Sequence, residues 1–446
     1  MKKQRIVRII LFIGAVALCA ILSAIALPLL NRKGGFSLAG IPIALIYALG
    51  AALLLRGSRP AKDAEPLAPF WLAAVLTALA LTIFARLSLL PHPSNDFKEY
   101  LSDWLEQIRL LPGLTALTTD IGNYNMPYFY LLFAFGKLLP QSADLYAIKL
   151  LSVLFDYVLA YFVMKLVMLK TKMRFIAVAS FMAALLVPSV IVNSAMWGQC
   201  DGILAAFALG GLYYGLRGRS RLSWTFFAVA LSVKLQAVFL LPMLPVLVFS
   251  GRIRLRDIWW FPAAFLALLV PAMLAGRGFI DCITIYWRQA NTYSQLSMLA
   301  PSVFAWLPEG TRSNIPVTAA GVFTAGTIVL AFLLYLFYRR KRLDNGALID
   351  AALLFSLIIP FFLPLMHERY FYIADAMATV YLFQKPRRWY IAGLVCIPSF
   401  LCHTAFLFNS VTVPMWLLSC CILAAICLVL RDFLTRLKGE AGTLGL

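Results

Sequence analysis

The sequence predicts an all-α integral membrane protein with about 14 transmembrane helices, because apolar runs recur from one end of the chain to the other. Hydrophobic residues make up 62% of the 446 residues, and the mean hydropathy is +0.87. Several runs approach the roughly 20 residues that a helix needs to cross a bilayer. Most loops between the runs are short, and we expect no soluble domain of any size.

The charge distribution sets the expected orientation. The net charge is +20, with 39 Lys and Arg residues against 19 Asp and Glu residues. In a soluble protein this excess would suggest a nucleic-acid partner. Here most basic residues fall in short loops on one side of the predicted path, as the positive-inside rule describes for cytoplasmic loops. We therefore expect a multi-pass protein of the cell membrane with both termini inside and no nucleic-acid partner.

The first three spans are predicted at residues 9–30, 38–55 and 68–90. A basic start followed by an apolar run also describes a signal peptide. The run is long and lacks a small-residue cleavage site, so we interpret it as an uncleaved span. With the N-terminus inside, the third span ends on the outside.

A polar stretch at residues 91–128 follows the third span and forms the first large outer loop. It carries five of the acidic residues: Asp96, Glu99, Asp103, Glu106 and Asp120. Beyond Glu99, four apolar residues recur at spacings of three and four: Tyr100, Trp104, Ile108 and Leu111. This spacing predicts an amphipathic helix that lies in the membrane interface on the outer face.

The next apolar piece, residues 128–139, is too short to cross, so we expect a surface or re-entrant helix. The remaining predicted spans are 147–169, 175–192, 202–216, 224–234, 237–249, 258–274, 317–338, 347–363, 372–383, 390–408 and 411–430. This path brings three polar clusters to the outer side: the stretch around Asp96, residues 197–201 and residues 367–369. A long outer loop at residues 276–316 lies on the same side.

Asp96 stands where the third span meets the outer aqueous phase, and an ionisable group at that place is a functional hypothesis by default. A carboxylate there could act as a general base. The alternative is a helix N-cap, because Ser94, Asn95 and Asp96 are all good capping residues and Glu99 lies at capping-box distance.

Two outer segments have the composition of a carbohydrate site. Asn123 and Tyr124 could bind a sugar by hydrogen bonding and stacking, although a turn before a proline-initiated helix explains them equally well. Trp197, Gln199 and Asp201 combine an aromatic face with an amide and a carboxylate. Trp197 alone could be an interfacial anchor.

Four basic side chains are candidates for binding a phosphate group: Lys234, His367, Arg369 and Arg288. Lys234 interrupts an apolar stretch, so it must snorkel, pair with a carboxylate or face a cavity. The guanidinium fork of Arg369 matches phosphate oxygens. A metal site at His367 and Glu368 is the rival, but two adjacent ligands form a poor set, so we expect no metal. The eight Cys residues show no paired spacing, and core packing is their expected role.

Six segments together resemble the polytopic GT-C glycosyltransferases, in particular bacterial proteins related to the GPI mannosyltransferases. The segments are SNDFKEYLSDWLEQIR, IGNYNMPY, SVLFDYVLA, NSAMWGQCDGILAAF, LSVKLQAVFLLP and MHERYFYIAD. The resemblance implies an inverting transfer of a monosaccharide, mannose in the family's name, from a polyprenyl-phosphate donor on the extracytoplasmic face. The acceptor would be a hydroxyl of a lipid, glycan or protein, and no cofactor is implied.

The same resemblance assigns roles by motif position. Asp96 would be the catalytic base, and residues 197–201 would form the second polar outer loop. Lys234, His367 and Arg369 would contact the lipid phosphate. The resemblance also implies three regions: two additional N-terminal helices at residues 1–67, a GT-C-like catalytic module at 68–384, and C-terminal helices with a cytoplasmic tail at 385–446.

The main alternative is a transporter or flippase for a lipid-linked sugar, which would share the sugar and phosphate contacts. Such a protein should show internal pseudo-symmetry and charges near the bilayer midplane. The sequence favours the enzyme, because no repeat is visible and the acidic residues gather at one face. A non-catalytic membrane scaffold is a third interpretation, and the density of polar residues on the outer face argues against it.

Overall fold

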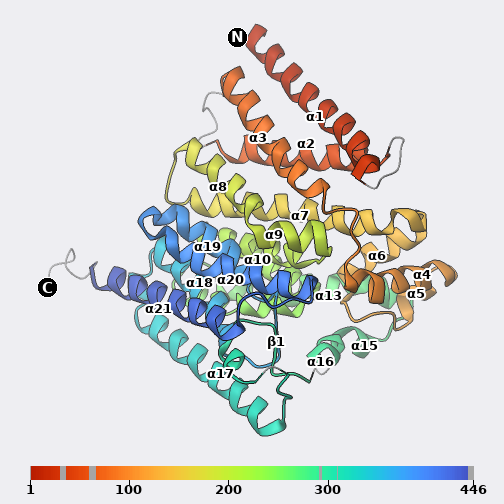
Figure 1. Cartoon of the computed structure of the whole chain (residues 1–446). Helices are drawn as coiled ribbons and strands as arrows, with labels where there is room; N and C mark the ends of the chain where they lie inside the picture. The colour runs from red at the N-terminus through yellow and green to blue at the C-terminus, as the bar shows by residue number, and fades with distance from the viewer. Residues whose placement is uncertain (1, 31–36, 60–66, 291–293, 309, 440–446) are drawn as a thin grey trace.

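The computed structural model describes residues 2–30, 37–59, 67–290, 294–308 and 310–439. This part of the chain is almost entirely helical (Figure 1). The two strands it contains, β1 (Ser297–Met298) and β2 (Met366–His367), form one short parallel pair. The short helices α4 to α6 lie at the right of Figure 1, and the C-terminus lies at the left.

The helices of the first half are α1 (Lys2–Leu30), α2 (Gly40–Gly57), α3 (Pro69–Leu87), η1 (Phe97–Leu101), α4 (Ser102–Leu110), α5 (Thr115–Thr118), α6 (Met126–Leu138), η2 (Gln141–Ala143), α7 (Asp144–Val167), α8 (Arg174–Leu186), α9 (Pro188–Ile191), η3 (Val192–Trp197) and α10 (Asp201–Leu216). The helices of the second half are α11 (Ser220–Val233), η4 (Leu235–Phe239), α12 (Met243–Phe249), η5 (Leu255–Asp257), α13 (Trp260–Ala267), α14 (Val270–Leu274), α15 (Phe279–Ile283), α16 (Ile285–Ala290), η6 (Val303–Trp306), α17 (Ile315–Tyr338), η7 (Arg340–Arg342), α18 (Asn345–Phe362), α19 (Tyr372–Gln384), η8 (Pro386–Arg388), α20 (Trp389–Leu407) and α21 (Met415–Gly439).

Eight helices in the described residues are long and apolar enough to cross a membrane: α1, α2, α3, α7, α17, α18, α20 and α21. A ninth span results if α8 and the α9–η3 segment, bent by 55° at a short break, count as one. The predicted number of 14 spans is therefore not confirmed. The predicted span 258–274 is divided into α13 and α14, and 237–249 into η4 and α12. The helices α11 and α19 have 14 and 13 residues, so each is only about 20 Å long.

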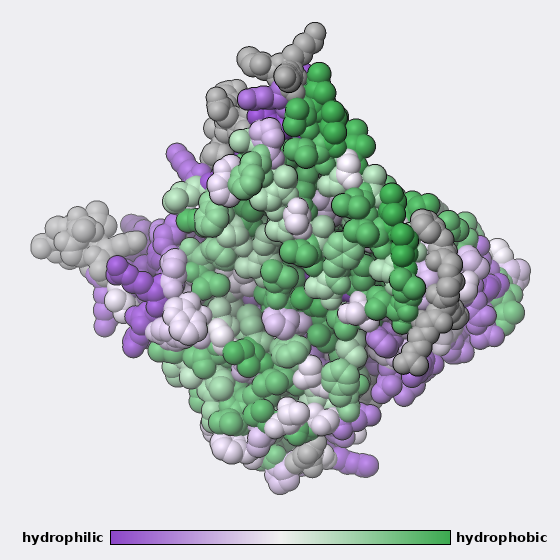
Figure 2. Space-filling view, turned by 45° about the horizontal axis from the view of Figure 1, so that its top comes forward, coloured by the Kyte–Doolittle hydropathy of each residue, from purple (hydrophilic) through white to green (hydrophobic). Residues whose placement is uncertain are grey.

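Apolar side chains cover the middle of the molecular surface. Figure 2 shows hydrophobic residues across the centre and hydrophilic residues towards the left and right edges. The exposed apolar side chains include Ile10 on α1 and Phe323 on α17, which are 63% and 77% exposed. Such surfaces suit contact with lipid acyl chains. Together with the eight long apolar helices, they indicate a multi-pass membrane protein.

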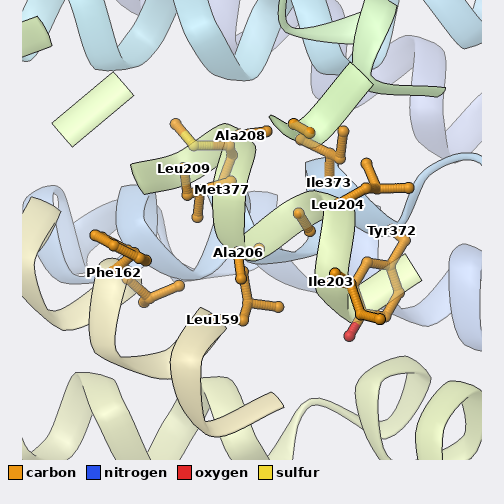
Figure 3. Close-up of a cluster of buried hydrophobic side chains, with 14 of the residues drawn as sticks. Leu159, Phe162, Ile203, Leu204, Ala206, Ala208, Leu209, Tyr372, Ile373 and Met377 are labelled. Carbon is orange, nitrogen blue, oxygen red and sulfur yellow. The ribbon is translucent and has the colours of Figure 1, made fainter. Parts of the chain in front are cut away.

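The centre of the bundle is formed by α7, α10 and α19 (Figure 3). Leu159, Leu209 and Met377 come from these three helices and are almost fully buried. Small residues allow close helix contact, as is common in membranes. A Cβ atom on Gly211 of α10 would lie 2.7 Å from the ring of Phe227 on α11.

A buried ion pair crosses this bundle, whereas from the sequence we expected the acidic residues to gather at one face. Arg86 on α3 donates to Asp156, halfway along α7, at 2.9 Å. Both side chains are at most 1% exposed. Asp375 on α19 is also buried and accepts hydrogen bonds from Ser189 and Ser399. Hydroxyl donors and the guanidinium compensate the cost of burying these carboxylates.

The polar stretch folds differently from the single amphipathic helix predicted from Glu99. A π-helical turn, η1, precedes α4, and the buried face consists of Leu101, Leu105 and Ile108. Tyr100, predicted on that face, is 48% exposed. Ile108 packs closely on Gly136 of α6, so this face contacts α6 rather than lying free in the interface. As predicted, α6 is short.

Candidate functional site

A cavity of about 630 Å³ lies between the polar stretch, the η3–α10 junction, the α11–η4 junction and the β1–β2 pair. Its size is within the range of small-molecule sites. It collects eight of the residues singled out from the sequence: Asp96, Glu99, Asn123, Tyr124, Gln199, Lys234, His367 and Arg369. These residues span most of the chain, so the fold assembles the cavity from distant segments.

The Asp96 carboxylate faces the cavity and does not cap a helix. Residue 96 precedes η1 in helical conformation, without a side-chain capping bond. The hydroxyl of Ser94 accepts from the N–H of Phe97 at 3.3 Å instead. The Asp96 Oδ2 atom accepts from Trp197 Nε1 at 2.9 Å and from Gln199 Nε2 at 2.6 Å. Two neutral donors, each more than a hundred residues away in the sequence, thus hold the carboxylate in place.

The segment that carries Trp197 and Gln199 has an unusual backbone conformation. The π-helical turn η3 ends at Gly198, whose φ of 80° is easily adopted only by glycine. The Trp197 ring is 1% exposed and stacks on Phe406 at 4.7 Å. Its backbone carbonyl accepts from Ser94 Oγ at 2.8 Å. This packing fixes the indole N–H in the direction of Asp96.

Lys234 lies where α11 ends and the backbone becomes extended. Its Nζ contacts Asp201 Oδ1 at 2.5 Å and Gln199 Oε1 at 3.3 Å, and it is 5.6 Å from the ring centre of Tyr124. The pairing with Asp201 is the structural alternative considered for this lysine. Because Lys234 also lines the cavity, the pair keeps a cation at the wall.

Arg369 extends this charged network towards the β1–β2 pair. Its Nη1 lies 2.6 Å from Glu368 Oε1, and its Nε lies 3.8 Å from Asp201 Oδ2. The guanidinium is 5.1 Å from the ring centre of Trp197, a cation–π distance. The side chain retains 12% exposure, so the guanidinium reaches the cavity while paired.

Burial shifts the pKa values of Glu368 and His367, which lie beside Arg369. Desolvation raises the pKa of the Glu368 carboxyl, although Arg369 opposes this. Desolvation, helped by Arg369 and Lys234, holds the pKa of His367 well below its ordinary value. The imidazole is therefore neutral near pH 7 and can act as a hydrogen-bonding group but not as a permanent cation. It packs beside the ring of Tyr370 at 4.9 Å.

Aromatic rings form another part of the cavity wall. The Tyr124 ring lies 5.8 Å from Trp104 and 4.8 Å from Tyr128, and its hydroxyl donates to Gln199 at 3.3 Å. Trp104 and Tyr100 line the cavity with Glu99, which is exposed. Such rings and amides are suited to contact the faces and hydroxyls of a sugar.

Two predicted residues lie behind the cavity wall and one lies outside the described part. Trp197 and Asp201 do not line the cavity, and they orient Asp96 and Lys234 respectively. The side chain of Arg288, on α16, lies outside the described residues. In the described residues, no group of three or more His, Cys, Asp and Glu side chains is arranged to hold a metal ion.

Several lining residues were not predicted from the sequence: Asn95, Gln236, Gln289, Met298, Tyr370 and Phe406. Gln236 could have been found from its place two residues after Lys234 in an apolar stretch. Gln289 and Phe406 carry no local signal, because each reaches the cavity only through the tertiary fold. The buried Asp156 was visible as a carboxylate inside a predicted span, which is a functional or structural marker.

The model of Glycosyltransferase family 87 matches residues 123–364, more than half of the chain. Gln199 and Lys234 lie inside the matched segment, whereas Asp96 precedes it and Arg369 follows it. No curated protein matches the chain. The predicted class of membrane glycosyltransferase is confirmed at this level, and the specific relation to GPI mannosyltransferases is not confirmed. The chain belongs to glycosyltransferase family 87 and is a membrane enzyme that transfers a sugar from a donor to an acceptor.

Proposed function

We propose that the enzyme transfers a monosaccharide from a polyprenyl-phosphate donor to an acceptor hydroxyl, with inversion, in the cavity that contains Asp96. The observation that carries the proposal is the position of this carboxylate. It is held by Trp197 from behind the cavity wall and by Gln199 on the wall, while Lys234 and Arg369 reach the same cavity from other elements. A base and a cationic surface thus face one space.

Asp96 is the proposed general base. Both of its hydrogen bonds end on Oδ2, and within the described residues no hydrogen bond reaches Oδ1. Oδ1 can accept the proton of an acceptor hydroxyl as that oxygen attacks the anomeric carbon. The bond between that carbon and the phosphate oxygen breaks on the opposite side, and the anomeric centre inverts.

The leaving group is a polyprenyl phosphate, and negative charge develops on it as the bond breaks. Lys234 and Arg369 can stabilise this charge by charge-assisted hydrogen bonds, with neutral His367 as a third donor. Both cations are already paired with Asp201 and Glu368, so they are held in place before the donor arrives. In this mechanism the chain needs no cofactor and no divalent metal.

An apolar cavity of about 190 Å³ adjoins the site and shares Gln236, Gln289, His367 and Tyr370 with it. Its other walls are mostly aliphatic and aromatic, including Val238, Leu363 and Pro364. We place the first isoprene units of the donor here, directly beyond the phosphate. The acceptor, a lipid, glycan or protein, would enter past Glu99 and Tyr100, which are exposed.

We propose the extracytoplasmic face for this cavity, because the positive-inside rule favours the cytoplasm for the basic loops at the other ends of the spans. In this proposed topology, the shorter and interrupted helices cross the membrane in addition to the eight long helices. The helices α1 and α2 precede the catalytic module, and α20 and α21 follow it.

The test is sugar transfer by purified full-length protein with a panel of polyprenyl-phosphate sugars, beginning with mannose. Asp96→Asn keeps both hydrogen bonds to Oδ2 possible but removes the base. We expect transfer to fall at least a hundredfold with donor binding retained. The matched control is Asp103→Asn, which changes an exposed carboxylate on α4 whose one hydrogen bond among the described residues comes from its helix neighbour Gln107. Full activity of Asp96→Asn would exclude the proposed base.

A further inference from the structure

A second polar cavity, of about 560 Å³, lies at the opposite end of the bundle from Asp96. It is formed where α7, α10 and α12 end and where α18 begins. The helix α18 runs from this cavity, at Asn345, to the segment that carries His367. Its 18 residues correspond to about 27 Å, close to the thickness of a bilayer core. The two cavities therefore face opposite membrane surfaces.

Three cations line this second cavity: Lys172, Arg217 and Arg252. No carboxylate is among its lining residues, and in the described part of the chain none of the three has an ion pair. Arg252 donates to the backbone carbonyl of Leu343 at 3.5 Å, a weak bond. The hydroxyl of Thr171 and the amide of Asn345 complete the polar lining.

Some of the other cations at this end of the bundle have carboxylate partners, and others have no ion pair within the described residues. Asp257 lies 3.0 Å from Arg254 and 3.8 Å from Arg221. Lys385 and Asp350 are 2.9 Å apart. Lys172, Arg217 and Arg252 differ in that they converge on one hollow, which four chain connections build.

The partial negative charges at the helix ends explain only part of the gathering of cations at this cavity, because they are too small to balance it. The carboxyl ends of α7, α10 and α12 each carry about half a negative charge, which favours nearby cations. Backbone N–H groups already cap these ends, including Arg217 N–H to Tyr213 O and Arg252 N–H to Leu247 O. Three half charges do not balance three full ones, so the cavity remains positive.

We propose that this cavity binds the phosphate group of an anionic ligand, either a phospholipid headgroup or a soluble phosphate. Two guanidinium groups and one ammonium group suit phosphate oxygens, and the volume accommodates a glycerophosphate headgroup. Under the orientation proposed above, the cavity lies at the cytoplasmic leaflet, where anionic lipids gather and basic pockets between helices bind them. This second cavity is separate from the site of sugar transfer, and the binding experiment below does not depend on the proposed transfer reaction.

The experiment measures thermal unfolding of the purified full-length protein in neutral detergent. The added ligands are phosphatidylglycerol, phosphatidylcholine or inorganic phosphate, at constant ionic strength. We expect phosphatidylglycerol to raise the Tm saturably and phosphatidylcholine to leave it unchanged. R217Q/R252Q should need at least tenfold more lipid for the same shift. The control R221Q/R254Q removes the same charge from a carboxylate-paired pair at the same end of the bundle and should respond as the wild type does.

The outcomes distinguish the two possible ligands, a phospholipid headgroup and a soluble phosphate. A saturable shift with phosphatidylglycerol alone identifies a lipid headgroup, and one with inorganic phosphate alone identifies a soluble anion. Equal responses of the two double variants, or equal effects of the two lipids, would overturn the proposal. If R217Q/R252Q does not fold, Arg217→Gln alone replaces it, because no side-chain hydrogen bond of Arg217 is broken within the described residues.

Discussion

The indole N–H of Trp197 offers a direct test of how Asp96 is prepared for catalysis. Trp197→Phe removes the 2.9 Å hydrogen bond to Oδ2 and keeps an aromatic ring for Phe406 and Arg369 to contact. A hydrogen bond to a charged group contributes about 1.5–3 kcal/mol. Because the bond also holds Oδ1 in the direction of the acceptor hydroxyl, its loss misplaces the base, and we expect kcat to fall by about tenfold to a hundredfold. The KM for the donor should change little, because the cations are untouched.

The matched control is Trp224→Phe. Trp224 is 5% exposed, and its indole N–H donates to the carbonyl of Arg254 at 3.3 Å. The bond lies at the end of the bundle away from Asp96. Both variants lose one buried indole hydrogen bond and a similar volume, so their Tm values should fall by similar amounts. Only Trp197→Phe should lose kcat. Equal activities of the two variants would refute the proposed role of this hydrogen bond.

Three further predictions concern the cations, the histidine and the orientation. Arg369→Ala should raise the KM for the donor at least tenfold and leave the acceptor KM almost unchanged; an unchanged donor KM would exclude Arg369 as a phosphate contact. Because the pKa of His367 is held below its unfolded value, the unfolded state binds the extra proton as the pH falls through about 6.5. The Tm should therefore fall between pH 7 and pH 5, and less steeply in His367→Gln. A cysteine at Leu110, which is 78% exposed on α4, should react with an impermeant thiol reagent in intact cells, whereas one at Lys172 should react only after permeabilisation.

Polar groups in an apolar chain were the most informative feature of the sequence. Asp96, Gln199 and Lys234 could be singled out because a membrane environment makes each of them costly to place without a reason. The structure brings all three to one cavity. Their roles stay predictions, because contact geometry does not reveal which bond forms or breaks.

The local backbone around these residues could not be predicted from periodicity. The π-helical turn η1 precedes α4, and Leu101 and Leu105 are buried where Tyr100 and Trp104 were predicted. The number of spans was also not predictable. Composition marks an apolar segment, but tertiary packing decides whether α13 and α14 join into one helix or stay short.

The acidic residues near the cavity differ in what they contact, and this difference favours Asp96 as the base. Asp201 meets Lys234 at 2.5 Å and also accepts from Asn193, so its charge is neutralised and its oxygens are occupied. Glu368 is fully buried against Arg369. Protonation of either carboxylate would leave a buried cation without its partner, and neither Asp201 nor Glu368 lines the cavity. Asp96 contacts neutral donors only, so it can take up a proton without breaking an ion pair. Glu99 lines the cavity as well, but in the described structure no hydrogen bond fixes its direction, and general-base catalysis depends on position before acidity.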